Sequence, residues 1–274
     1  MSPMTSDTEQ AVREVRAVRA TTFGAAAGDY DRYRAGVPGE VVERILPAGV
    51  GAVLDLGAGT GAMTRRLVER VERVYAVDPD PRMTELLSGN CPSVEVRQGT
   101  GEAIPLPDAC VDAVVVASAW HWMEPGTAIP EIARVLRPGG ALRIVWNRRD
   151  RSVPWVDDFE QRRLDIIGSD DWVTDRIKHY LEEPWLPAGA PLADIEISSL
   201  SWNAEMTKED LVGLITTFHH YIAASSEVQS QMMRRLAEYV ADDERIVADI
   251  DGADGRAPLV EVPMSCAVWG ATRI

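Results

Sequence analysis

The amino-acid sequence predicts an α/β fold in which a mostly parallel sheet carries helices on both faces. Short runs of β-forming residues alternate with amphipathic helical segments between residues 41 and 147, which is the pattern of strands joined by helical crossovers. The run from Val111 to Ala117 is almost wholly apolar, as expected for a central strand covered on both faces. At residues 53–71 a strand runs into a glycine-rich turn and then into a helix.

The elements follow from periodicity and from breaker residues. In chain order we expect a helix at 41–46, a strand at 53–56, a helix at 63–71, a strand at 74–77, a helix at 83–87, strands at 94–96 and 111–117, a helix at 129–136 and a strand at 141–146. After residue 147 the rhythm changes. Segments 195–202 and 259–269 read as two late strands, and we expect them to pair antiparallel.

Composition limits the classes of protein to which the chain can belong. Its 274 residues, 46% hydrophobic and 26% charged, are typical of a folded globular protein. The net charge of −15 argues against nucleic-acid binding, because a protein that tracks phosphates needs clustered cations. The longest apolar runs are too short to span a bilayer. Three isolated cysteines indicate a reducing compartment and no metal site. We therefore expect a cytoplasmic protein that binds neither membrane nor metal.

These patterns divide the chain into four segments. Residues 1–40 hold an amphipathic helical pattern and a Gly- and Ala-rich stretch followed by Gly36 and Pro38, and we expect a helical lid with a hinge. Residues 41–147 form the sheet core. Residues 148–192, rich in tryptophan and interrupted by prolines, predict a helical cap insertion. Residues 193–274 supply the C-terminal strands and helices that complete the sheet and the substrate pocket.

The glycine turn predicts a site for a small ligand. Gly57, Gly59 and Gly61 alternate with small residues, which lets backbone approach a ligand closely. The spacing differs from the Gly-x-Gly-x-x-Gly of dinucleotide sites, and Asp55 lies two residues before the first glycine, where it would repel pyrophosphate. A zwitterionic amino-acid tail suits this turn better. Asp78 ends the next strand, where ribose hydroxyls are bound in such sites.

Together these motifs resemble those of the class I S-adenosylmethionine-dependent methyltransferases, of the methyltransferase type 11 kind. The resemblance covers residues 52–146 and includes the turn at 55–61, Val77-Asp78, the loop at 98–107, the strand at 112–118 and the turn at 136–140. It implies a Rossmann-like, seven-stranded, mostly parallel sheet. It also implies an enzyme that uses S-adenosyl-L-methionine and releases S-adenosyl-L-homocysteine. The expected cofactor-binding residues are Tyr30, Arg34, Asp55, Gly57, Ala58, Gly59, Gly61, Asp78, Pro79, Met83, Thr100, Gly101, Glu102 and Ser118. Relatives often carry an acid or an alanine where this chain has Thr100 and Gly101.

The acceptor side is expected beyond the apolar fourth strand and in the segments after it. Relatives with these motifs act mostly on small molecules, which implies a small-molecule acceptor, in specialised metabolism. His121 and His220 are candidate general bases, since a free imidazole titrates near ~6.5. Candidate substrate-binding residues are Trp120, Trp122, Trp155, His219 and Tyr221.

Several alternatives stay open at this point. His121 can instead orient its loop, and core packing explains each tryptophan individually. Methyl transfer can also proceed by proximity and desolvation alone. Two other classes of function compete: a protein that binds S-adenosylmethionine for cyclisation or regulation, and an NAD(P)-dependent oxidoreductase, against which the glycine spacing argues. The sequence leaves the methylated atom open, and the protein is a monomer or a homodimer.

Overall fold

The computed structural model describes residues 27–34, 36–168, 186–187, 189–250 and 257–274. The first 26 residues of the expected helical lid at 1–40 lie outside these ranges, as do residues 169–185 and 188 of the expected helical cap insertion. Within the described part, none of the helices is long and apolar enough to cross a membrane.

One mixed sheet organises the chain, with its strands in the order β3-β2-β1-β4-β5-β8-β6 and with β7 paired to β8. The strands β1 to β5 are mutually parallel, and β8 is antiparallel to both β5 and β6. This confirms the mostly parallel sheet and the antiparallel pairing of the two late strands; β7 is a short addition to the seven expected. The strands are β1 (Ala52–Leu56), β2 (Arg73–Asp78), β3 (Glu95–Gln98), β4 (Val111–Ala117), β5 (Leu136–Arg149), β6 (Leu192–Thr207), β7 (Ala248–Ile250) and β8 (Leu259–Arg273).

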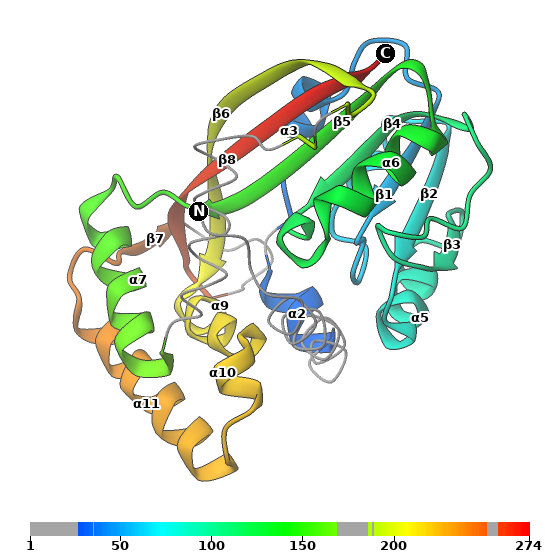
Figure 1. The fold of residues 1–274 in the computed structure, drawn as a ribbon. Helices are drawn as coiled ribbons and strands as arrows, with labels where there is room; N and C mark the ends of the chain where they lie inside the picture. The colour runs from blue at the N-terminus through cyan, green and yellow to red at the C-terminus, as the bar shows by residue number, and fades with distance from the viewer. Residues whose placement is uncertain (1–26, 35, 169–185, 188, 251–256) are drawn as a thin grey trace, which may run out of the picture.

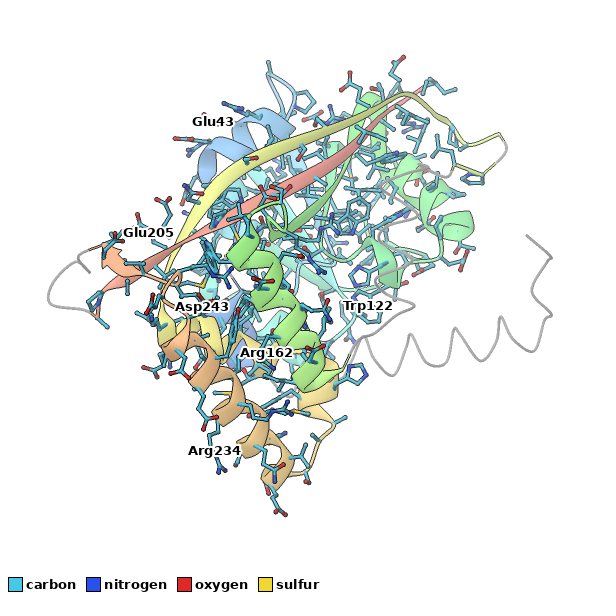
Figure 2. The ribbon with its side chains drawn as sticks, turned by 90° about the vertical axis from the view of Figure 1, so that its left-hand side faces the viewer. Glu43, Trp122, Arg162, Glu205, Arg234 and Asp243 are labelled. Carbon is cyan, nitrogen blue, oxygen red and sulfur yellow. The ribbon has the colours of Figure 1, made fainter. Side chains whose placement is uncertain are left out.

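The helices fall into two groups (Figure 1). The first covers the sheet: α3 (Gly39–Ile45), α4 (Thr64–Leu67), α5 (Pro81–Asn90) and α6 (Pro125–Val135). The second lies beyond one end of the sheet, and we call it the helix cluster: α7 (Pro154–Ile167), α9 (Lys208–Gly213), the 3-10 turn η3 (Leu214–Thr217), α10 (His219–Ile222) and α11 (Ser226–Asp242). Figure 2 shows β6 and β8 running from this cluster along the sheet.

Alternating side chains build separate cores on the two faces of the sheet. On β4, Val114 and Val116 pack with Ile129 and Ile132 of α6, while Val115 belongs to the core that includes α3 and α4 on the other face. The helix cluster has a third core. It joins α7 to α9, α11 and the near end of β8, and its members include Phe159, Leu211, Leu236 and Val262. Helix α7 therefore packs both on the C-terminal helices and on the near ends of β6 and β8.

A short helix, α2 (Ala27–Tyr33), connects the two parts of the molecule (Figure 1). On the sheet side, Asp31 accepts hydrogen bonds from Arg65 Nη1 and Nη2, both 2.9 Å long. On the cluster side, Arg32 lies 3.4 Å from Asp210 and Arg34 Nε donates to Thr217 Oγ1 at 3.0 Å. These ion pairs are part-exposed and individually weak. Tight packing therefore carries more of the docking: the ring of Tyr33 lies against Gly213, where an added Cβ would be 2.5 Å from Tyr33 Cζ.

We predict that Gly213→Ala loosens α2. The new methyl group collides with Tyr33, and overpacking of this kind costs about 1–3 kcal/mol. Amide hydrogen exchange within residues 27–33 should accelerate at least about tenfold, which corresponds to about 1.4 kcal/mol of local stability. In a Tyr33→Ala background the same substitution should have little effect, because the clash is gone. Equal acceleration in both backgrounds would show that Gly213 acts through its own helix and not through α2.

Candidate active site

The glycine turn lies at the carboxyl end of β1, between α2 and the loop after β4. Gly57 and Gly59 have φ values of +74° and +55°, which favour glycine. A Cβ on Gly57 would lie 2.5 Å from Ala119 Cβ, so this glycine allows the turn to pack against the loop after β4. Gly59 has no heavy atom within 4 Å of the corresponding position. The turn is therefore closely packed on one side and open to a ligand at Gly59.

Asp55 is fully buried beneath this turn. Thr64 Oγ1 donates to its Oδ2 at 2.5 Å, while its Oδ1 is buried without a hydrogen-bond partner. Burial raises the pKa of Asp55 to about 7, and the Thr64 hydrogen bond only partly opposes this shift. A buried carboxylate oxygen without a donor is costly. An ammonium group placed beside Oδ1 would supply the missing donor and the compensating charge.

Asp78 ends β2, and its carboxylate is fixed by two backbone N–H groups. Gly59 N donates to Oδ2 at 2.9 Å and Asp80 N donates to Oδ1 at 3.0 Å. Burial nevertheless raises the pKa of Asp78. Each carboxylate oxygen has a second lone pair, so Asp78 can accept ligand hydroxyls while holding the glycine turn in place. The two oxygens of Asp78 are thus held in a fixed orientation. Its role as the acid that binds the ribose stays a prediction.

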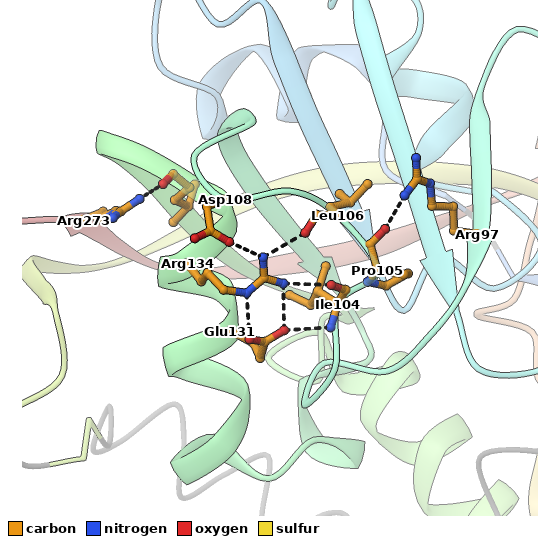
Figure 3. A network of polar contacts seen from close by, with 9 residues as sticks. Arg97, Ile104, Pro105, Leu106, Asp108, Glu131, Arg134 and Arg273 are labelled. Carbon is orange, nitrogen blue, oxygen red and sulfur yellow. Dashed lines mark hydrogen bonds and ion pairs between the residues drawn. The ribbon is translucent and has the colours of Figure 1, made fainter.

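Arg134 shapes the loop after β3 (Figure 3). It donates to Glu131, to Asp108 at 2.7 Å and to the carbonyl oxygens of Ile104 and Leu106, both at 2.8 Å. The Glu131 carboxylate in turn accepts from Ile104 N at 3.0 Å. This network, which sequence reasoning did not find, anchors the loop that carries Thr100 to Glu102.

The glycine at position 101 has a packing reason. An added Cβ there would lie 2.6 Å from Met123 Sδ, so a larger residue at this place would displace the Met123 side chain. Glu102 also joins the loop after β3 to the loop after β4, because its Oε1 accepts from Glu124 N at 2.7 Å. The two loops form one wall of the candidate site.

The loop after β4 holds the aromatic residues of the candidate acceptor edge. It begins at Ser118, whose φ is +54°, and continues as the 3-10 turn η2 (Trp120–Trp122). Trp120 is buried and packs in the core beside α6, and its role in substrate binding stays a prediction. Trp122 is half-buried, and its ring lies 4.7 Å from that of His121.

His121 does not titrate near 6.5 as the sequence analysis assumed. Its side chain is buried, and its Nδ1 has no hydrogen-bond partner. Burial lowers the pKa of His121 to about 3, and the positive charge of Arg34 lowers it further. The imidazole is therefore neutral near pH 7, and it is a weak base.

The remaining predicted residues lie on α2 and in the helix cluster. Trp155 packs against the third core. Tyr221 faces α2; burial raises its pKa, and so do the nearby Asp29 and Tyr33. His220 belongs to α10. Its Cδ2 lies near the end of α7, 3.9 Å from the position that a Cβ on Gly168 would take. The side chains of Tyr30 and His219 are outside the described part of the structure.

A buried charged group on α7 was missed by sequence reasoning. Glu160 and Arg163 lie on the helix face that also buries Val156, Phe159 and Ile166. Their spacing places both charges on the apolar face of an amphipathic helix. Two charged residues on the apolar face of a helix are a pattern from which the sequence could have predicted this buried group.

Comparison with known proteins agrees with this geometry. The model of a methyltransferase domain family matches residues 54–144. An uncharacterized methyltransferase of Mycobacterium tuberculosis is 42% identical over 221 residues, which cover 80% of this chain and 86% of that protein. The malonyl-[acyl-carrier protein] O-methyltransferase of Serratia marcescens is 35% identical over 128 residues, covering 45% and 50%. In structure, the YcgJ protein of Bacillus subtilis shares the fold with a TM-score of 0.50 at 20% identity, covering 86% and 97% of the two chains.

The sheet order, the glycine turn and the two carboxylates are those of a methyltransferase. The chain belongs to the class I S-adenosylmethionine-dependent methyltransferases, and its cofactor is S-adenosyl-L-methionine. The described residues fit that molecule: the unpaired Asp55 Oδ1 suits its ammonium group, and the open space at Gly59 allows it to approach the turn.

The pKa of Asp55 leads to a prediction about stability. The folded state holds the Asp55 proton to about pH 7, whereas the unfolded chain releases it near ~3.9. Between these values the folded state binds more protons, so its stability falls as pH rises. Asp55→Asn should remove a loss of roughly 2–4 kcal/mol between pH 5 and pH 8 in the ligand-free protein. Chemical denaturation at both pH values measures this loss. The control is Asp112→Asn, which changes a carboxylate of the neighbouring strand β4 whose pKa is lowered. Identical pH dependence in wild type and Asp55→Asn would contradict the assignment.

Proposed function

We propose that this methyltransferase transfers the methyl group of S-adenosylmethionine to a small-molecule acceptor of specialised metabolism. In this proposal the acceptor lies between the loop after β4 and the helix cluster. The observation that supports it is the unpaired, buried Oδ1 of Asp55 in a strand that runs into the glycine turn, where Gly59 is open. Such an oxygen favours a ligand with an ammonium group at this edge of the sheet, on the side of α2 (Figure 1).

Each part of the cofactor has candidate partners among the chain's own residues. Asp55 would take the ammonium group, and the turn formed by Gly57, Ala58, Gly59 and Gly61 would take the carboxylate. Asp78 would hold the ribose hydroxyls, next to Pro79. The loop at Thr100–Glu102, with Met83, would border the adenine, and Ser118 and Tyr30 would complete the site.

The chemistry requires little from the side chains of this edge. Bound S-adenosylmethionine supplies a methyl group that its sulfonium already activates. The chain then needs to align the acceptor and keep water out, and proximity of this kind contributes a large part of a rate enhancement. A neutral, buried His121 serves this purpose as a positioning residue and not as a general base. His220, if it acts as the base, does so from the opposite side of the site.

The helix α2 supports a covering role for the N-terminal segment. Its contacts bridge the glycine-turn side, through Asp31 and Arg65, and the helix cluster, through Arg32 and Arg34. A segment held on both sides of an open-sheet site can exclude water when it is docked. Residues 1–40 are therefore proposed to act as a lid, of which α2 is the described part.

Other features support the class of acceptor and the setting. The Serratia marcescens relative acts on malonyl-[acyl-carrier protein], which favours an acceptor of metabolism over a nucleic acid. The net charge of −15 supports the same choice. Cys91, Cys110 and Cys266 are free thiols, in keeping with a proposed cytoplasmic monomer or homodimer.

We predict that Asp78→Asn weakens S-adenosylmethionine binding at least about 30-fold. Loss of a charged acceptor for two hydroxyls costs roughly 2 kcal/mol or more. Calorimetry measures this, with S-adenosylhomocysteine as a second ligand and NAD as a ligand that should not bind. Asp80→Asn, which changes the neighbouring acid that caps α5, is the matched control. Unchanged affinity in Asp78→Asn would remove the ribose assignment.

A methyl-transfer assay separates the proposed function from its rivals. Protein, S-adenosylmethionine with a labelled methyl group and fractions of small-molecule extract should give S-adenosylhomocysteine and a labelled product in equal amounts. Asp78→Asn should lower the rate in parallel with its affinity at subsaturating cofactor. Binding of the cofactor without S-adenosylhomocysteine in any fraction would favour a cyclisation or regulatory role.

A further inference from the structure

The strand β6 forms an open edge of the sheet. It is the last strand in the order β3-β2-β1-β4-β5-β8-β6, and it pairs with β8 over residues 192–207. Figure 1 shows it as the outermost strand beside β8. Among the described strands, none pairs with its other side. Alternate residues of β6 therefore direct backbone N–H and C=O groups away from β8, where another strand can bind them.

The middle of this edge lacks the features that keep edge strands apart. Edge strands are usually protected by charged side chains, by proline or by a bulge. The segment 197–204, with the sequence Ile-Ser-Ser-Leu-Ser-Trp-Asn-Ala, contains no charged residue and no proline. It also pairs with β8 in continuous register, since the register shift of β6 lies earlier, between Ala193 and Glu196. This segment is therefore open to pairing with a further strand.

Side chains of the segment 197–204 leave apolar surface uncovered on both faces of the edge. Ile197 is 52% exposed, although it lies opposite the buried Trp269 of β8. Leu200 and Trp202 project to the other face, because side chains alternate along a strand. Both pack against the core that includes α3 and α4, and both are only half-buried. A further strand beside β6 would cover apolar side chains on each face.

We propose that β6 pairs antiparallel with β6 of a second copy of this chain, which joins the two sheets into one. This inference goes beyond the proposed function. A two-fold axis perpendicular to the sheet, passing near Leu200, brings the segment 197–204 of each chain beside its own copy. Both copies then use the same surface, which is the arrangement of most homodimers. Leu200 lies beside its own copy at the axis, and Ser199 faces Ser201 of the second copy.

The acids of β6 permit this pairing. Residues that face each other across an antiparallel pair lie on the same face of the sheet, and like charges in such positions are destabilising. Glu196 and Glu205 are an odd number of positions apart, so they project to opposite faces and cannot face each other. With the axis near Leu200, Glu196 faces Ala204 of the second copy, and Glu205 faces Ile195. The strand thus pairs with its own copy without opposing two acids.

Sedimentation velocity tests the pairing on the full chain. The protein is studied at about 100 μM and in about 0.15 M salt, which screens the repulsion between two chains of net charge −15. Most of the wild type should sediment as a dimer, with a Kd of about 10 μM or tighter. The double variant Ser199→Lys/Ser201→Lys sets lysines against lysines across the axis and should weaken the dimer at least tenfold. Both serines are exposed, so a cooperative melt should remain.

The matched control places the same charges elsewhere. Ser226→Lys/Ser230→Lys adds two lysines to exposed positions of α11 and should sediment like the wild type. Should the lysine variant of β6 lack a cooperative melt, Ile197→Lys takes its place, because this exposed position tolerates a long polar side chain and the charge protects the edge.

A complementary variant tests whether the two edges face each other. Ser199→Glu/Ser201→Glu should be monomeric alone for the same reason as the lysine variant. An equal mixture of the two variants should restore a dimer that contains one chain of each, because opposite charges then meet across the axis. Native mass spectrometry separates the mixed dimer from the two parent chains by mass.

Three outcomes would overturn the proposal. They are a wild type that stays monomeric at about 100 μM, a dimer that the folded lysine variant keeps, and a mixture of the two variants without mixed dimers. None of these measurements depends on catalysis. Calorimetry should give the same affinity for S-adenosylmethionine in the wild type and in the lysine variant, so the failure of one proposal leaves the other standing.

Discussion

The buried carboxylate of Asp55 is the constraint around which the cofactor side of this protein is built. A strand must bring it to the edge of the sheet, a glycine turn must pass over it, and Thr64 must begin the next helix beneath it. Thr64 donates a hydrogen bond to Oδ2 of Asp55, while Oδ1 has no hydrogen-bond partner. Burial thus makes the charged form of Asp55 unfavourable in the free protein, and the cationic group of the proposed ligand would relieve this cost. Binding energy gained in this way is available only in the complex, which is how a site can be selective without many contacts.

The acceptor side depends on a different kind of constraint, the docking of segments that are distant in sequence. The helix cluster has its own apolar core and reaches the sheet mainly through the long strands β5, β6 and β8. The helix α2 then bridges the cluster and the glycine-turn side through ion pairs and through the Tyr33–Gly213 contact. The proposed lid would need to break only these contacts of α2 to open, and neither core contains them. An enzyme that admits an acceptor and then excludes water needs such a joint.

The sequence predicted what local patterns determine. The strands, their parallel arrangement and the glycine turn with Asp55 and Asp78 follow from periodicity and spacing, while the reversed last strand follows from the resemblance to the methyltransferase sheet. Features set by partners far along the chain could not be predicted. The contact of Gly101 with Met123 joins two separate loops, and the Arg134 network depends on a loop and a helix meeting. The pKa of His121 depends on its burial and on Arg34, which is 87 positions away. Helix α4 is shorter than its apolar spacing suggested, since the chain there turns through i→i+3 hydrogen bonds such as Arg66 N to Met63 O.

The charges on α7 show how far a closer reading of the sequence can go. An amphipathic helix with Glu160 and Arg163 on its apolar face violates the usual pattern, and such violations concentrate at functional sites. Replacement of a buried ion pair by apolar residues is often neutral or stabilising, so stability alone gives no reason to keep this one. Glu160 pairs with Arg149 as well as with Arg163, so the acid ties the end of β5 to α7. The helix pattern marks the two charges on α7, whereas only the structure shows that Arg149 of β5 is their partner.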